Sequence, residues 1–90
     1  MKIIHFSLDV HKKLENIRLK DPKLFKKIHK QIRLLREDPR HKSLRLHKIT
    51  REVKNTWSIS IDKSLRMLYT ENEFIYFFEI GTHDEVYRKR

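Results

Sequence analysis

The fold is decided by residues 57–80, which read WSISIDKSLRMLYTENEFIYFFEI. Apolar and polar residues alternate through the first part of this segment, at the period of two that is typical of strands with one buried face. Residues 74–80 form a nearly continuous apolar run, as expected of a central strand. The joins at residues 62–64 and 71–73 have the length of hairpin turns. The segment therefore predicts three consecutive antiparallel strands.

The residues before position 57 predict two further strands, at 2–6 and 44–49, with two helices between them. Ser7 is a natural N-cap for the first helix. Pro22 can begin the second helix, because the first helical position needs no N–H group. Pro39 then ends that helix, since the residue before a proline disfavours helical geometry.

The predicted order of elements is β-α-α-β-β-β-β, within a single domain over residues 1–90. This order indicates an α+β fold, in which a two-helix hairpin packs on one face of a small, mainly antiparallel sheet. We expect the opposite face to be partly open and to carry Ser58, Ser60 and Arg66.

The charge of the chain is uneven and favours a polyanionic partner. The net charge is +10 over 90 residues. Residues 11–54 hold 16 Lys and Arg against five Asp and Glu, whereas residues 55–90 hold five against six. A nucleic acid fits this field best. A solvated basic surface and a membrane surface are alternatives, but a membrane helix needs aromatic anchors and Phe25 is the only aromatic residue in the basic half.

Several classes of protein are disfavoured by composition. The absence of cysteine excludes disulfides and thiolate metal sites, and it fits a reducing, cytoplasmic location. No apolar run approaches the length that spans a bilayer, so we expect no membrane partner. With one glycine and no HExxH spacing, the sequence predicts no glycine-rich phosphate loop, no metal and no small-molecule cofactor.

Four side chains could carry chemistry. His83 follows an apolar strand and Gly81, a glycine that can let the chain turn, so it could transfer a proton near neutral pH or have a structural role. His47 has the same two interpretations. Arg66 interrupts an apolar strand, either at an edge or to bind an anion. Tyr87 is by default a packing group.

The most specific segments resemble the RelE/ParE superfamily of bacterial and archaeal toxins, and above all its ribonuclease branch, which includes RelE, YoeB and YafQ. These segments are LHKI at 46–49, WSISI at 57–61, LRMLY at 65–69 and IGTHDEVY at 80–87. The resemblance implies a RelE-like fold and a toxin that a small antitoxin protein neutralises. It also implies metal-independent cleavage of mRNA, commonly on the ribosome, so mRNA and rRNA are expected partners.

The same resemblance implies roles for individual residues. Arg66 matches the arginine that the family places against the scissile phosphate. His83 matches a YafQ-type histidine that transfers a proton, and His47 matches a second active-site histidine. Tyr87 matches an aromatic residue that orients or stacks the substrate.

The sequence departs from RelE itself in one strand. Ser58 and Ser60 stand where RelE has two lysines, so the resemblance favours a histidine mechanism over a lysine one. The remaining positive charge near the site is expected from residues that we predict to bind RNA: Arg45, Lys48, Arg51 and Lys54.

Two alternatives to an mRNA endoribonuclease stay open at this point. One is a ParE-like toxin that inhibits DNA gyrase without cutting RNA. The other is a degenerate homologue that retains only antitoxin binding.

Overall fold

The computed structural model describes residues 2–49 and 55–88. Its elements are β1 (Ile4–Phe6), α1 (Leu8–Lys20), α2 (Pro22–Glu37), the short 3₁₀ helix η1 (Lys42–Leu44), β2 (His47–Ile49), β3 (Thr56–Ser60), β4 (Leu65–Glu71), β5 (Ile75–Thr82) and α3 (His83–Arg88).

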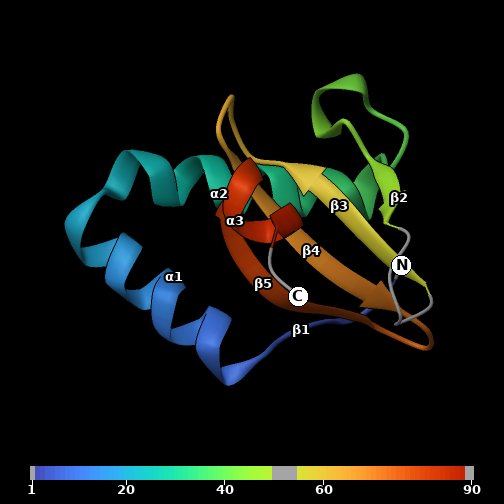
Figure 1. The fold of residues 1–90 in the computed structure, drawn as a ribbon, viewed down its shortest axis with the longest axis horizontal. Coiled ribbons are helices and arrows are strands. Elements are labelled where there is room, and N and C mark those ends of the chain that lie inside the picture. The colour runs from blue at the N-terminus through green and yellow to red at the C-terminus, as the bar shows by residue number, and fades with distance from the viewer. Residues whose placement is uncertain (1, 50–54, 89–90) are drawn as a thin grey trace.

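The strands form one sheet in the order β1-β5-β4-β3-β2. The three pairs from β2 to β5 are antiparallel, and β1 joins the edge of β5 in parallel. The α+β fold with a mainly antiparallel sheet is therefore confirmed. Figure 1 shows α2 passing behind the sheet and α3 lying in front of it.

The core lies between the sheet and the pair α1 and α2. Ile59 pairs with Met67 across β3 and β4, and both side chains are fully buried. Val10 of α1 and Ile28 of α2 belong to the same buried cluster. The alternation of β3 thus points one set of side chains into this core and the other set, which includes Ser58, to the opposite face.

Both helices begin where the sequence predicts. The Ser7 side chain accepts a hydrogen bond of 3.1 Å from the backbone N–H of Val10. Asp21 caps α2 in the same way, accepting from Leu24 at 3.2 Å, and Pro22 follows it in the first turn. Side-chain caps of this kind supply partners for N–H groups that the helix itself leaves unpaired.

The predicted strand at 44–49 is wrong in its first half. Leu44 belongs to η1 and is fully buried. Arg45 then adopts a left-handed conformation, with φ 43° and ψ 47°. This conformation breaks an extended strand, so β2 begins only at His47.

The expectation of a partly open opposite face is also wrong near Arg66, because α3 covers it. Thr82 and Glu85 form a capping box at the start of α3. The Glu85 Oε1 accepts from the Thr82 N–H at 2.8 Å, and the Thr82 Oγ1 accepts from the Glu85 N–H at 3.2 Å. Val86 of α3 is fully buried against this face.

Gly81 serves close packing, not a turn. It lies within β5 and pairs with Arg66. A Cβ at this position would lie 2.7 Å from Glu85 Oε1 and 3.2 Å from Glu85 Cβ. The missing side chain therefore lets α3 lie directly against the end of β5.

Asp62 fixes the turn that leads from β3 into β4. Its Oδ1 accepts from the N–H of Leu65 at 2.8 Å and from the N–H of Ser64 at 2.9 Å. These two bonds hold the pKa of the Asp62 carboxyl below its usual value, with the bond from Leu65 contributing most.

We predict that Asp62→Ala lowers the free energy of unfolding at pH 7 by about 1 kcal/mol, the usual cost of losing such bonds. Because the folded pKa is lowered, the contribution of Asp62 is fully present above the unfolded pKa and is lost as pH falls through the folded value. Urea denaturation at pH 7 and pH 3 should show a smaller difference between variant and wild type at pH 3. Glu73→Ala, in the exposed turn before β5, is the control; an equal effect of both variants would contradict the prediction.

Candidate active site

Ser58 is the centre of a polar cluster on the face that α3 covers. It is fully buried in β3, and its Oγ accepts a hydrogen bond of 2.7 Å from Arg66 Nε. The hydroxyl of Tyr87, from α3, lies 2.7 Å from the same Oγ. One small side chain thus connects a cation on β4 with a phenol on α3.

His47 closes the cluster into a ring. Its Nε2 lies 2.9 Å from the Tyr87 hydroxyl, and its Nδ1 lies 3.2 Å from the carbonyl oxygen of Arg45. Arg66 Nη2 donates to that same carbonyl at 3.0 Å and lies 3.5 Å from His47 Nδ1. The sheet register explains the meeting, because His47 pairs with Ser58 across β2 and β3.

The ring can hold His47 in either charge state. A hydroxyl donates one hydrogen and can also accept. With His47 neutral, Ser58 can donate to Tyr87, Tyr87 to Nε2, and the Nδ1–H to the Arg45 carbonyl. With His47 protonated, Nε2–H donates to Tyr87, which donates to Ser58. When His47 gains or loses a proton, rotation of the Tyr87 and Ser58 hydroxyl groups therefore reverses the direction of the hydrogen bonds between them.

Arg66 is a buried cation held in a fixed orientation. It is only 8% exposed, and a buried cation is costly unless its N–H groups are bonded. Ser58 and the Arg45 carbonyl supply those bonds on two sides, and the Tyr87 ring lies 5.9 Å from the guanidinium carbon. Fixed positive charge of this kind needs no reorganisation when an anion arrives.

His83 lies beside the ring of polar groups and is not bonded into it. Its imidazole centroid is 4.4 Å from that of Tyr87, and its side chain is 69% exposed. Its Nδ1 lies 3.8 Å from Asp84 Oδ1. As the first residue of α3, His83 is placed one turn from Tyr87, at the solvent side of the cluster.

The predicted RNA-binding residues separate into three groups. Arg45 contributes its carbonyl oxygen to the cluster, as described above. Lys48 pairs with Trp57, and its Nζ lies 5.9 Å from the Trp57 ring, so the structure does not bring it to the cluster. Arg51 and Lys54 lie outside the described residues.

Two contributions to the cluster were not found from the sequence. The Arg45 carbonyl has no sequence signal, because its direction depends on a left-handed backbone. Ser58 was expected on the same sheet face as Arg66 and as a departure from the lysine of RelE, but its bonds to Arg66 and Tyr87 were not expected. The capping box Thr82-x-x-Glu85 is the signal that could have shown α3, and with it the approach of Tyr87 to the sheet.

The described parts of the chain offer no evident metal or membrane site. Across residues 2–49 and 55–88, no group of three or more His, Cys, Asp or Glu side chains is placed to hold a metal ion. Within the same ranges, every helix is too short or too polar to cross a membrane.

Solved structures of similar fold include toxins and toxin–antitoxin complexes. One is the YoeB/ParE toxin from Agrobacterium tumefaciens, with a TM-score of 0.75 and 19% identity, covering 92% of this chain and 99% of that one. Another is the DinJ–YafQ toxin–antitoxin complex of E. coli, with a TM-score of 0.79 and 18% identity over 96% of this chain and 97% of that one.

A third is the YoeB–YefM complex from Staphylococcus aureus, with a TM-score of 0.70 and 19% identity over 92% of this chain and 98% of that one. The chain has the YoeB/YafQ toxin fold. No family profile and no curated protein matches the sequence, so the likeness to YoeB and YafQ rests on the fold.

The packing of α3 against β5, which brings Tyr87 to the sheet, can be tested by a substitution at Gly81. We predict that Gly81→Ala lowers the free energy of unfolding by about 1–3 kcal/mol, because the added methyl group overpacks the contact with α3. Urea denaturation measures the loss, and NMR chemical shifts of His47 and Tyr87 should change because α3 moves.

Glu85→Ala is the matched control, because it removes the nearest oxygen but leaves Glu85 Cβ in place. Glu85→Ala also loses the capping bond to Thr82, so it is the reference for the double variant. Gly81→Ala should cost less stability in the Glu85→Ala background than in the wild type, but it should still cost some. Wild-type stability and unchanged Tyr87 shifts in Gly81→Ala would show that α3 is not packed as described.

Proposed function

We propose that this protein is the toxin of a type II toxin–antitoxin pair, and that it is a metal-independent endoribonuclease that cleaves mRNA on the ribosome. The observation that carries the proposal is the hydrogen-bonded ring of His47, Ser58, Arg66 and Tyr87, with His83 beside it. The YoeB/YafQ fold and the positive charge of the chain support it.

RNA carries its own nucleophile, so the protein needs only three functions. A base takes the proton of the 2′-hydroxyl, whose oxygen then attacks the adjacent phosphorus. The bond from phosphorus to the 5′ oxygen breaks, and an acid supplies a proton to that oxygen. A fixed cation stabilises the charge that builds up on the phosphate. The products are a 2′,3′-cyclic phosphate and a 5′-hydroxyl.

Arg66 is assigned to the phosphate because its guanidinium is already oriented. Its bonds to Ser58 and to the Arg45 carbonyl fix the plane of the group. A planar guanidinium can bind two phosphate oxygens at once, which a lysine amine cannot.

His47 is assigned as the base and His83 as the acid. The Nε2 of His47 already faces a hydroxyl group, that of Tyr87, at 2.9 Å, and the 2′-hydroxyl of the substrate would take that position. His83 is exposed and can reach a leaving oxygen on the solvent side. Tyr87 lies between the two imidazoles and can orient the substrate by stacking.

The same ring disfavours a gyrase inhibitor of the ParE type. A toxin that acts by binding alone has no need for two imidazoles, a phenol and a buried guanidinium in contact. An antitoxin is proposed as a protein partner, since two of the similar structures are complexes named DinJ–YafQ and YoeB–YefM.

Mapping of mRNA 5′ ends after induction of the chain tests the function as a whole. Cuts within translated frames, with 5′-hydroxyl ends, support the proposal. Intact mRNA together with double-strand DNA breaks would support the gyrase inhibitor instead. Intact mRNA and intact DNA would indicate a homologue without activity.

We predict that Arg66→Lys stays folded and cleaves RNA at least about 100-fold more slowly, the lower range for loss of a charge-stabilising group. The lysine keeps the charge but cannot bond Ser58, the Arg45 carbonyl and two phosphate oxygens together. Arg66→Ala should also lose about 1–3 kcal/mol of stability, because it leaves buried acceptors unpaired.

A cooperative melt separates folding from activity in both Arg66 variants. If Arg66→Lys is folded and cleaves RNA at the wild-type rate, the guanidinium has a structural role only and no role in cleavage.

We predict that His83→Gln keeps the fold and RNA affinity but cleaves at least about 100-fold more slowly. The wild-type single-turnover rate should rise and then fall with pH, because His47 must be neutral and His83 protonated. The fall at high pH should disappear in His83→Gln, since the group that must stay protonated is gone.

His11→Gln, on the exposed surface of α1, is the control for loss of a histidine and should leave rate and pH profile unchanged. A wild-type rate for His83→Gln, in protein without contaminating ribonuclease, would remove the acid role from His83.

A further inference from the structure

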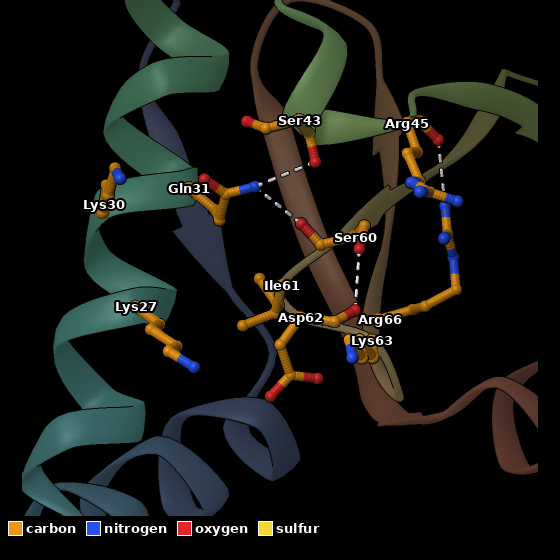
Figure 2. Close-up of a pocket in the computed structure, with 10 residues that line it drawn as sticks. All are labelled: Lys27, Lys30, Gln31, Ser43, Arg45, Ser60, Ile61, Asp62, Lys63 and Arg66. Carbon is orange, nitrogen blue, oxygen red and sulfur yellow. Dashed lines mark hydrogen bonds between the residues drawn. The ribbon is translucent and has the colours of Figure 1, made fainter.

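A second basic feature lies next to the candidate active site. A hollow of about 520 Å³, here called the basic pocket, lies between α2, η1 and the turn from β3 to β4. Figure 2 shows that Lys27 and Lys30 of α2 form one side, while Arg45 and Arg66 lie on the other. Lys63 in the turn adds a fifth cation.

The charge of the basic pocket is strongly positive. Five Lys and Arg side chains line it, against the single carboxylate of Asp62. That carboxylate is already bonded to the N–H groups of Ser64 and Leu65 through Oδ1, as described above. The positive charge of Lys27 makes a smaller contribution to the lowering of the Asp62 pKa. Four cations remain in excess, and such a concave site attracts an anion.

The wall of the basic pocket is built by a buried side chain. Gln31 is 6% exposed, and its Nε2 donates to the carbonyl oxygens of Ser60 at 2.9 Å and Ser43 at 3.3 Å. These bonds join α2 to β3 and to η1 (Figure 2). The distance between the lysines of α2 and the sheet is therefore set by the fold, not by flexible side chains alone.

The basic pocket is continuous with the candidate active site. Arg66 belongs to both, and so does Arg45, whose carbonyl oxygen joins the ring while its residue lines the pocket. The left-handed backbone of Arg45, uncommon for a residue with a side chain, produces this double placement. On β3, Ser58 in the ring and Ser60 in the pocket are two positions apart, roughly 7 Å along a strand.

We propose that the basic pocket binds a backbone phosphate of the RNA strand, adjacent to the phosphate that Arg66 holds. The inference rests on the proposed function and adds a second contact for the same strand. One extended nucleotide can bridge the separation between Ser58 and Ser60, and the pocket has room for a phosphate with its sugar. Because the lysines contact only the backbone, they fix the position of the strand without reading its sequence.

The experiment uses short 2′-O-methyl RNA oligonucleotides, which cannot be cleaved, with the sequence of a mapped cleavage site. Single phosphates are replaced in turn by neutral methylphosphonates, and affinity is measured at 50 mM salt. In the wild type, two adjacent replacements should each weaken binding by about tenfold, as expected for loss of a charge-assisted contact. In the Lys27→Ala/Lys30→Ala variant, only the methylphosphonate at the scissile phosphate should still weaken binding by about tenfold.

The matched control is Lys12→Ala/Lys20→Ala, which removes the same charge from exposed positions on α1. It should keep the two-phosphate pattern of the wild type. The slope of log affinity against log salt should fall by roughly 0.7 more in the pocket variant than in this control, the value for one phosphate contact on a single strand.

The outcomes separate this inference from the proposed function. An unchanged two-phosphate pattern in Lys27→Ala/Lys30→Ala would overturn it, as would a uniform loss at every phosphate. If oligo-glutamate displaces the bound oligonucleotide at the same concentration as unlabelled oligonucleotide does, the basic pocket would be assigned to an acidic protein segment instead. The sequence of the oligonucleotides comes from a mapped cleavage site, but they are not cleaved, so the measured affinities do not depend on turnover. The proposed function, by contrast, fails if cleavable mRNA stays intact.

Discussion

The candidate active site depends on the burial of one guanidinium. Arg66 lies under α3 with 8% of its surface exposed, and a cation in that position needs acceptors that the core cannot supply. Ser58 of β3 and the carbonyl of Arg45, between η1 and β2, meet this need. The same acceptors also bring Tyr87 and His47 within bonding distance. The hydrogen bonds that stabilise Arg66 on this sheet face are therefore also the bonds that assemble the candidate site.

The part of the fold that follows periodicity could be predicted from the sequence. Alternation in residues 57–62 sets which side chains face the helices, and Ser7 and Pro22 set where helices begin. Arg66, His47 and Tyr87 could be named individually by resemblance. Their mutual contacts could not, because the register that pairs His47 with Ser58 depends on where β2 starts. That start depends in turn on the left-handed backbone of Arg45. A positive φ can be anticipated at glycine or asparagine, but not at an arginine.

The two faces of the sheet have different roles: one contains the main core, and the other carries the candidate active site. The face toward α1 and α2 is apolar and contains the main core, so its side chains decide whether the chain folds. The face toward α3 is polar around Ser58 and Arg66, and Leu68 and Val86 are buried on it. Substitutions on the first face should act mainly through stability. Those on the second can change chemistry while the first face keeps the fold intact.

The element order has a consequence for synthesis. A ribosome makes the basic helices α1 and α2 before the strand that carries Arg66, and it makes Tyr87 after both. The nascent chain therefore presents the positive charge of α1 and α2 before all residues of the candidate active site have been made. β1 must also wait for β5, its partner from the other end of the described chain, before the sheet is complete. The basic helices are thus made before the polar cluster around Ser58 can form.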